Sequence, residues 1–369
     1  MGIKTCYSVK KTIDEIIVDI NGQAQGLDAK MVLYFASSKF DQVVFGDKMK
    51  KAFAGSTVIG CSTAGEIVSG KMLKESVVVM ILGSDIIDDV NVRIIEDVKS
   101  QNTIPEAFKA FEEYYKTSMS TMDINEYVGL ILIDGLSVAE ERIMDKIGNL
   151  TNVNFIGGSA GDDLGFKATY VCADGEVYTN AAVLALMKPA TGFDIIKTQS
   201  FKNLDIQLTA TKVDEASRTV FEFNGKPAAK AYAEALEIDV AEAEDRFMSN
   251  PLGLMVGDEP FVRSPQKIVD GGIVFYCNII EGMDLNILES GDIVKDTSKA
   301  IQVKEKDLGG IAGIINFHCI LRTLELEKKD LTREYGEIFS DINTIGFSTY
   351  GEEFLGHINQ TATMLVFQK

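Results

Sequence analysis

The chain has 369 residues, of which 46% are hydrophobic and 25% are charged, a composition typical of a globular protein with two domains of ordinary size. Its formal net charge of −19 argues against nucleic acid or an anionic membrane as the main partner, because both require a basic face. No apolar run reaches the ~20 residues that span a bilayer, and residues 1–11 lack the apolar core of a signal peptide. We therefore expect a soluble, cytoplasmic protein with no membrane insertion.

The first recognisable unit spans residues 31–83. "MVLYFASS" (31–38) predicts a strand, and the apolar spacing of "FDQVVFGDKMKKAF" (40–53) predicts a helix. A second strand leads into the turn "GCSTAGEI" (60–67), and "KESVVVMILG" (74–83) predicts a third strand. The expected unit is strand, helix, strand, turn, strand.

The same order recurs in the middle of the chain. "VGLILIDGLS" (128–137) predicts a strand, and "VAEERIMDKIGNL" (138–150) predicts a helix with one apolar face. "NFIGGSAGDD" (154–163) is the matching strand and turn. "ATYVCADGEVYTNAAVLALM" (168–187) predicts a hairpin across its Ala-Asp-Gly.

A third copy lies near the C-terminus. "AGIINFHC" (312–319) predicts a strand, and "TLELEKKDLTREYGEIF" (323–339) predicts one helix. "TIGFSTYGEE" (344–353) repeats the turn, and "QTATMLVFQ" (360–368) predicts the closing strand. Repetition of this kind predicts an α/β fold of mixed sheets with packed helices, built from repeated units.

The stretch between the second and third copies has a different pattern. It predicts a helix from Pro227 and antiparallel strands around Gly271, and we place a domain boundary near residues 215–225. We therefore expect two domains. Residues 1–220 hold two units, and residues 221–369 hold the third unit with the antiparallel section.

The repeated Gly-x-Ser-Thr-x-Gly-Glu turn has two interpretations. Its glycines let a ligand approach the backbone, and its hydroxyl and carboxyl groups offer short-range hydrogen bonds. Alternatively, each turn only joins two strands, and its acid accepts stray backbone N–H groups. Arg322, at a strand end, pairs either with a structural acid such as Glu352 or with an anionic ligand.

We expect the binding site where the turns at 60–66, 157–162 and 346–352 converge with Arg322. The loop "GHINQT" (356–361) adds polar groups that either bond within the loop or contact the ligand. The predicted ligand-binding residues are Ser62, Thr63, Glu66, Ser159, Asp162, Arg322, Ser348, Thr349, Glu352, His357 and Asn359.

An enzymatic alternative rests on "GGSAG" (157–161), which fits the nucleophile-elbow pattern of hydrolases with Ser159 as nucleophile. That pattern requires a helix after the serine, and the sequence here predicts a loop and a strand. Cys61 has no base near it in sequence. With two histidines and no paired cysteines, a metal site is not expected. We expect no enzyme; an acidic protein that docks a basic partner is a further alternative.

The ordered motifs resemble the FIST family, with both its N-terminal and its C-terminal part. The resemblance covers about residue 30 to residue 368. The motifs are "IGCSTAGEI" (59–67), "NFIGGSAGDD" (154–163), "FHCILR" (317–322) and "IGFSTYGEEFLGHINQT" (345–361). The family positions fall on Gly60, Ser62, Gly65, Glu66, Gly157, Gly158, Ser159, Gly161, Asp162, Cys319, Arg322, Gly346, Gly351, Glu352, His357, Asn359 and Thr361.

The resemblance implies a bacterial sensory input module that binds a small ligand such as an amino acid. Because the family domain fills this chain, a separate histidine kinase, diguanylate cyclase or chemotaxis protein is the expected partner. Some members of the family are similar to haem proteins that sense nitric oxide. If haem is bound, His357 or His318 is the implied axial ligand, with the Cys319 thiolate as another option; otherwise no cofactor is expected.

Overall fold

A computed structural model describes residues 2–100 and 103–369, which form two compact units. Unit 1 comprises the chain up to Thr198 together with Thr297–His357 and Ala362–Lys369, and unit 2 comprises Gln199–Asp296 and Ile358–Thr361. All three copies of the repeated unit therefore lie in unit 1. The division of the sequence at residue 220 stays a prediction. Among the described residues, no helix is long and apolar enough to cross a membrane.

Unit 1 contains three six-stranded sheets of mixed direction, which confirms the predicted α/β class. In the first sheet the spatial order is β1 (Ile3–Ser8), β6 (Val77–Leu82), β2 (Met31–Ser37), β3 (Thr57–Thr63), β10 (Val171–Ala173) and β11 (Glu176–Tyr178). In this sheet β2 and β3 run parallel, as a strand–helix–strand connection requires, and the other pairs are antiparallel.

The second and third sheets repeat this order. The second is β7 (Ile87–Glu96), β12 (Ala181–Pro189), β8 (Val128–Ile133), β9 (Phe155–Ser159), β24 (Glu352–Phe354) and β25 (His357–Ile358). The third is β13 (Phe193–Thr198), β26 (Ala362–Gln368), β22 (Ile311–Cys319), β23 (Asn343–Thr349), β4 (Glu66–Val68) and β5 (Lys71–Leu73). The unit is thus longer than the sequence pattern predicts, by a leading strand and, in the first and third copies, by a short hairpin after the turn. In the second copy the predicted hairpin is confirmed, with β10 and β11 on either side of Asp174 and Gly175.

The short hairpins are exchanged in a cycle. Hairpin β10–β11 of the second unit completes the first sheet, β24–β25 of the third completes the second, and β4–β5 of the first completes the third. Because each hairpin follows directly after a Gly-Ser turn, this exchange brings the three turns to a common centre.

The first glycine of each motif has a packing reason. At these positions a Cβ atom would lie 2.5 Å or less from the carbonyl oxygen of the parallel neighbouring strand, a separation that no side chain tolerates. The pairs are Gly60 with Tyr34, Gly157 with Ile131, and Gly346 with Asn316. The same register in all three sheets makes Tyr34, Ile131 and Asn316 equivalent positions.

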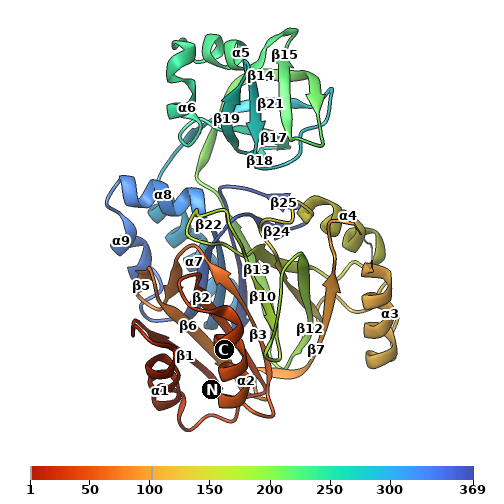
Figure 1. Cartoon of the computed structure of the whole chain (residues 1–369), viewed down its shortest axis with the longest axis vertical. Helices are drawn as coiled ribbons and strands as arrows, with labels where there is room; N and C mark the ends of the chain where they lie inside the picture. The colour runs from red at the N-terminus through yellow and green to blue at the C-terminus, as the bar shows by residue number, and fades with distance from the viewer. Residues whose placement is uncertain (1, 101–102) are drawn as a thin grey trace. The chain divides into compact units, whose positions relative to one another are not determined.

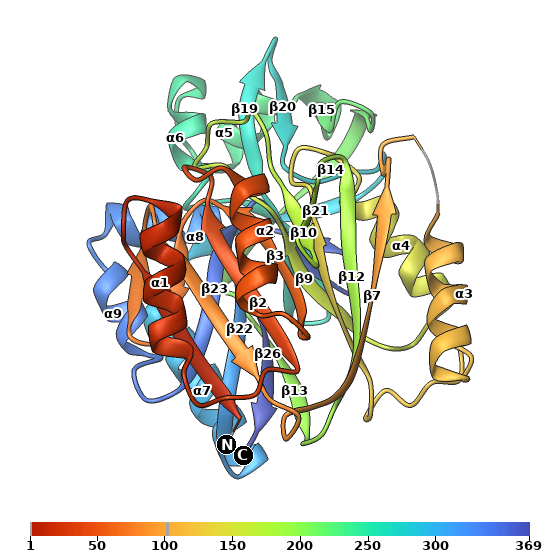
Figure 2. The same cartoon turned by 60° about the horizontal axis from the view of Figure 1, so that its bottom comes forward.

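The helices cover the outward faces of the sheets. Figure 2 shows α1 (Ile13–Ala24) and α2 (Gln42–Ala52) over β2 and β3, and α3 (Ile104–Tyr115) and α4 (Glu140–Leu150) belong to the second sheet. The third sheet carries α7 (Ile293–Leu308), α8 (Ile320–Lys328) and α9 (Thr332–Glu337). The single helix predicted over 323–339 is wrong: the chain breaks between α8 and α9 at Asp330, whose φ is +57°.

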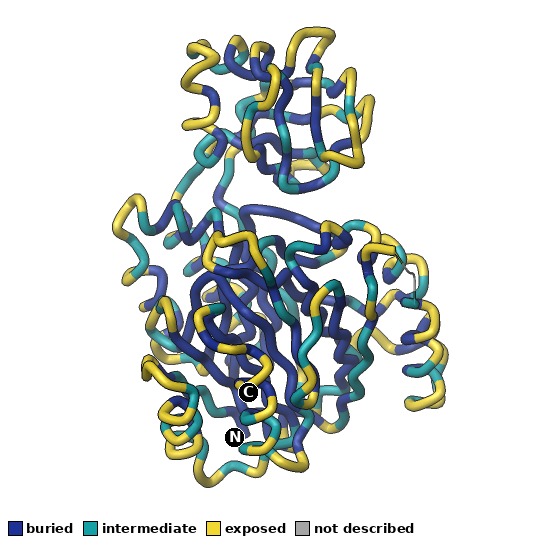
Figure 3. The backbone as a smooth tube through the Cα atoms, in the orientation of Figure 1, coloured by how far each residue is buried: buried dark blue, intermediate teal, exposed yellow. Residues whose placement is uncertain are grey.

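The inward faces of the three sheets share one apolar core. The ring centroid of Phe35 lies 4.5 Å from that of Phe347 and 6.2 Å from that of Phe317, so sheets one and three meet there. Figure 3 shows the central strands of unit 1 buried along their length. This core holds the strand ends, and so the turns, in fixed positions.

Unit 2 is the predicted antiparallel section (Figure 1). Its strands are β14 (Phe201–Asp214), β15 (Thr219–Phe223), β16 (Lys226–Pro227), β17 (Leu252–Val256), β18 (Glu259–Arg263), β19 (Pro265–Val269), β20 (Gly272–Phe275) and β21 (Asp284–Ser290). Helix α5 (Ala228–Ala235), a 3₁₀ turn at Val240–Glu242 and α6 (Ala243–Arg246) accompany them. Phe223, Tyr232 and Phe275 lie in its own apolar core.

Candidate functional site

The three Gly-Ser turns meet, and backbone hydrogen bonds join each turn to the next. These bonds are Gly161 N to Ser62 O (3.0 Å), Ser348 N to Gly65 O (2.8 Å) and Ser159 N to Gly351 O (2.9 Å). Turn convergence was expected from the repeat alone. The backbone groups at the centre are consumed by these bonds, so they hold the turns together.

The acids of the first and third turns each accept a hydrogen bond from the threonine of the same turn. Glu66 accepts from Thr63 Oγ1, and it also accepts from Ser76 N (3.1 Å) and Ser76 Oγ (2.6 Å) immediately before β6. Thr349 Oγ1 donates to Glu352 Oε1 at 2.6 Å. Burial outweighs these donors and raises the pKa of Glu66 to about 7. The role of these two acids as ligand contacts stays a prediction.

Asp162 closes the loop after the second turn. Its carboxylate accepts from Phe166 N at 2.9 Å and Lys167 N at 2.6 Å, and it also accepts from the Tyr350 hydroxyl. The Asp162 side chain therefore has its acceptors filled by backbone donors. Its role as a ligand contact stays a prediction.

Two of the turn serines bond to protein groups. Ser62 Oγ donates to Gly161 O at 2.8 Å, and Ser348 Oγ lies 2.7 Å from Thr323 Oγ1 of α8. The Ser348 contact links the third turn to the first residues of α8. Arg322 is the neighbouring residue on that helix, and it has a different environment.

Arg322 is 1% exposed, yet most of its guanidinium lacks partners. Its Nη2 donates to Thr297 Oγ1 of α7 at 3.0 Å, and the guanidinium also interacts with the Tyr335 hydroxyl, whereas Nε and Nη1 make no hydrogen bond of good geometry among the described residues. The pairing of Arg322 with a structural acid such as Glu352 stays a prediction. Buried polar groups are normally satisfied, so these two nitrogens mark an incomplete site.

Tyr335 of α9 and two side chains of β22 complete the surroundings of Arg322. Tyr335 Oη accepts from Asn316 Nδ2 at 3.3 Å and lies 2.9 Å from His318 Nδ1. Burial and the Arg322 charge hold the pKa of His318 well below its usual range, so His318 is neutral. Tyr335 Oη and His318 Nδ1 thus share one hydrogen bond beside Arg322.

We call these side chains of unit 1 the Arg322 cluster. Its members are Thr297, Asn316, His318, Arg322, Tyr335 and Thr344. Besides the two arginine nitrogens, Asn316 Oδ1, His318 Nε2 and Thr344 Oγ1 are buried without a partner among the described residues. Five unpaired polar atoms between one sheet and the helices that cover it are many for a folded protein.

The equivalent region is apolar in the other two sheets. Tyr34, Ala36 and Val58 of the first sheet occupy the positions of Asn316, His318 and Thr344, and they pack under α1 and α2. The second sheet has Ile131, Ile133 and Phe155 there. At these three positions, only the third sheet of the described unit 1 has polar side chains between its strands and its helices.

Comparison with known proteins decides the family. A model of the FIST N domain matches residues 30–226, and a model of the FIST C domain matches residues 228–354. The chain belongs to the FIST family. FIST domains are known as sensory domains for small ligands, not as catalytic domains. An uncharacterized protein of Methanocaldococcus jannaschii is similar, with 24% identity over 393 residues that cover 92% of this chain and 74% of that protein.

Ser159 of this FIST chain lies in a second buried polar group. Its Oγ is 3.2 Å from Glu140 Oε1 and 3.4 Å from Glu353 Oε1, and His357 Nδ1 is 3.0 Å from the same Glu353 oxygen. The acid thus lies between serine and histidine, so the histidine cannot remove the serine proton directly. No helix follows Ser159 either, because β9 leads into a loop.

The other enzymatic candidate is Cys61. It is 1% exposed, and burial raises the pKa of its thiol well above the usual range. A buried thiol of this kind is a poor nucleophile. The geometry therefore gives no support to the serine or cysteine hydrolase alternative.

The histidines fit haem poorly. His318 and His357 are both buried, and each bonds a side chain of unit 1 through Nδ1. No histidine lines the cavity between α4 and Leu355, and none lines the cavity beside Ile320 and Leu324 of α8. Cys319 is buried as well. Haem binding stays a hypothesis that the side chains of unit 1 do not favour.

Asn359 belongs to unit 2, where it follows Ile358. It is 1% exposed, and its Oδ1 has no partner among the described residues. Its neighbour Gln360 fixes this segment, because its side chain accepts from Ser264 Oγ at 2.7 Å and donates to Met248 O at 2.9 Å. The role of Asn359 as a ligand contact stays a prediction.

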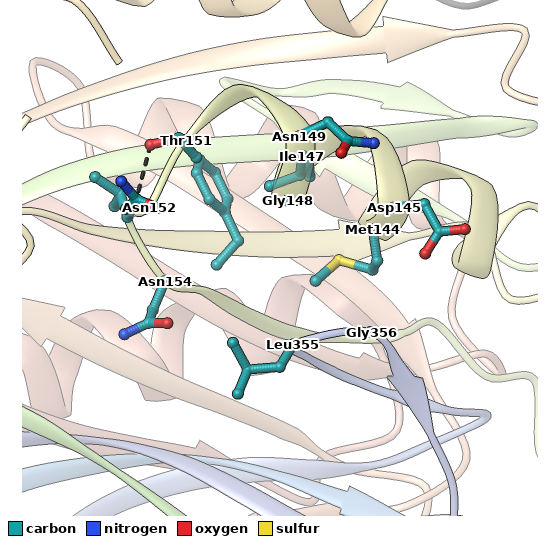
Figure 4. A pocket seen from close by; sticks show the side chains of 12 residues that line it. Met144, Asp145, Ile147, Gly148, Asn149, Thr151, Asn152, Asn154, Leu355 and Gly356 are labelled. Atoms are coloured by element: carbon teal, nitrogen blue, oxygen red, sulfur yellow. Dashed lines mark hydrogen bonds between the residues drawn. The ribbon is translucent and has the colours of Figure 1, made fainter. Parts of the chain in front are cut away.

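Described residues of unit 1 line a cavity of about 550 Å³ between α4 and the tip of the β24–β25 hairpin at Leu355 and Gly356 (Figure 4). Others line a smaller cavity of about 260 Å³, formed by Ala64 of the first turn, Asp163 and Leu164, and Ile320, Leu324 and Glu327 of α8. The smaller cavity adjoins the converging turns and lies against α8.

Sequence reasoning missed part of the cluster. Arg322 and His318 were selected, whereas Thr297, Asn316, Tyr335 and Thr344 were not. One signal was available: Asn316 and His318 alternate in "IINFHC", so they share one face of a buried strand. Thr297 and Tyr335 come from separate helices, and no local pattern joins them to that strand.

Proposed function

We propose that this chain is a cytoplasmic sensory protein that binds a small polar metabolite, such as an amino acid, inside unit 1. The observation that carries the proposal is the Arg322 cluster, in which five polar atoms are buried without partners. Leaving one such atom unsatisfied costs about 1–3 kcal/mol, so a partner molecule stabilises the folded protein by supplying the missing bonds.

The position of the cluster supports a signalling role. Thr323 joins α8 to the third turn through Ser348, and the third turn is bonded to both other turns. A ligand under α8 therefore acts on an element that is connected to all three sheets. A useful switch requires only about 1–3 kcal/mol of coupling between ligand and partner. The partner is a separate histidine kinase, diguanylate cyclase or chemotaxis protein.

A thermal-shift experiment tests this function. The full chain is heated with each of the common amino acids and with a panel of small organic acids, sugars and amines. We expect a concentration-dependent rise in melting temperature with at least one class of compound. No stabilisation by any compound, together with no Soret absorbance after haem addition, would overturn the sensor proposal.

A further inference from the structure

We infer that Arg322 binds the anionic group of the ligand and that the ligand is a small carboxylate. This inference rests on the proposed function and specifies its chemistry. It starts from the charge of Arg322, which is permanent at any pH at which the protein folds. A permanent charge that is 99% buried requires compensation, and two of the guanidinium nitrogens have no hydrogen-bond partner among the described residues.

The rest of the cluster is neutral, and its unpaired donor groups belong to Arg322. Tyr335 and Thr297 are uncharged, and His318 is neutral. Nε and Nη1 of Arg322 are two N–H donor groups without a hydrogen-bond partner among the described residues. Donors without an acceptor are the complement of an anion, and carboxylate oxygens accept strong bonds from a guanidinium.

The ligand needs no ammonium group. The next carboxylate along α8, Glu325, pairs with Lys329 Nζ at 2.6 Å. The unpaired acceptors of the cluster are neutral atoms, Asn316 Oδ1 and Thr344 Oγ1, which suit a hydroxyl group better than a cation. We therefore expect lactate or propionate to bind more tightly than alanine, which has the same carbon skeleton but carries an ammonium group.

Helix α8 has room to respond. Arg322 faces the cluster, whereas Ile320 and Leu324 of the same helix line the cavity of about 260 Å³. Because the cluster is closed to solvent, entry of a ligand requires α8 to move, and that cavity lies in its path. Binding at Arg322 is thereby coupled to a displacement of α8.

Matched arginine variants test the inference. The full chain is prepared as wild type, Arg322→Met, Arg322→Gln and Arg333→Met, where Arg333 is an exposed arginine of α9 paired with Glu337. Melting temperatures are measured alone and with propionate, lactate, alanine, inorganic phosphate and chloride. We expect lactate and propionate to stabilise wild type and Arg333→Met more than alanine does.

For Arg322→Met we expect two changes of opposite sense. The response to carboxylates is lost, and the ligand-free protein melts higher by roughly 2 °C or more, because a buried unpaired charge has been removed. A merely structural arginine predicts a lower melting temperature. Arg322→Gln provides the same comparison if the methionine variant fails to fold.

The outcomes separate the inference from the proposed function. A carboxylate response that survives in both Arg322 variants overturns the inference and leaves the sensor proposal intact. A response to phosphate or chloride alone overturns the carboxylate assignment. If alanine stabilises wild type more than lactate does, the expected ligand class is wrong. If no compound of this panel, or of the panel of amino acids, organic acids, sugars and amines, raises the melting temperature of the wild type, both proposals are overturned.

Discussion

The first and third sheets have the same strand order, register and turn, yet their outer layers differ. Under α1 and α2 the first sheet presents Tyr34 and Val58. The ring of Phe45 meets the ring of Tyr34 edge to face, and the two ring centroids are 5.2 Å apart. Under α7–α9 the third sheet presents Asn316 and Thr344 at the same positions. One layer stabilises the fold by burying apolar surface, and the other leaves polar groups unpaired. Comparison of equivalent positions in the repeat thus distinguishes residues that stabilise the fold from residues that we propose to contact a ligand.

The largest expected effect comes from mutating one residue in each of these two layers. Phe45→Ala opens a cavity in the apolar layer of the first sheet, and we expect it to lower the free energy of unfolding by about 3–5 kcal/mol. Asn316→Leu in the third sheet removes an unsatisfied oxygen, and we expect a change below about 1 kcal/mol. Urea unfolding of both variants measures the difference. Equal losses would show that the polar layer is as important for folding as the apolar one.

The shared register of the sheets gives the second prediction. Gly157→Ala places a Cβ against the Ile131 carbonyl oxygen. We expect the free energy of unfolding to fall by about 1–3 kcal/mol, because the backbone of β8 must shift to make room for the new atom. Gly148→Ala is the control: it lies in α4 with no atom within 4 Å of the new Cβ, and it should stabilise by about 0.5–1 kcal/mol. A neutral Gly157→Ala would contradict the close approach of β8 and β9.

The two histidines should differ in their effect on pH dependence. Burial disfavours the charged form of His357, but the Glu353 carboxylate outweighs it and raises the pKa of His357 to about 9. Its contribution to stability is therefore complete below about pH 6.5 and is lost as the pH rises through about 9. The contribution of neutral His318 changes only below about pH 6.5, because its pKa is lowered.

Unfolding free energies between pH 7 and 9.5 test this difference. We expect His357→Gln to remove part of the decline with rising pH that the wild type shows, by about 1–2 kcal/mol over the interval. His318→Gln should leave the slope in this interval unchanged. Parallel slopes for wild type and His357→Gln would mean that His357 is already neutral at pH 7.

The smallest effect on stability is expected beside α8. Leu324→Trp fills part of the cavity of about 260 Å³, and because Leu324 is partly exposed we expect less than about 0.5 kcal/mol change in the free energy of unfolding. The variant should nevertheless weaken the thermal response to carboxylates, because α8 loses the space into which it moves. An unchanged response would separate ligand binding from displacement of α8.

Much of the fold could be predicted from local pattern. The repeated strands and the meeting of the three turns follow from periodicity and from the repeat. The exchange of hairpins could not be predicted, because β4 pairs with β23, almost three hundred residues away, and short strands carry no signal of their partner. The break at Asp330 was missed because the apolar spacing continues across it.

The site was predictable in part for a similar reason. Arg322 is conspicuous beside apolar strand residues, whereas Thr297 is an unremarkable position in an amphipathic helix. The sequence predicts ligand contacts at turn acids such as Glu66, but it does not show that both oxygens of Glu66 already accept bonds from Thr63 and Ser76. Sequence gives the chemical type of a side chain but not which of its atoms remain unpaired.

Because β4–β5, β10–β11 and β24–β25 are exchanged in a cycle, each of the three sheets of unit 1 is completed by strands from another repeat. Removal of one repeat takes the edge strands from one neighbouring sheet and leaves the hairpin that another repeat donates to it without a sheet to join. A fragment that stops at residue 226, where the FIST N match ends, lacks β22, β23 and β26, which are strands of the centre of the third sheet. The matched segment is therefore an evolutionary module rather than an autonomous folding one, and unit 1 should unfold as a single cooperative block.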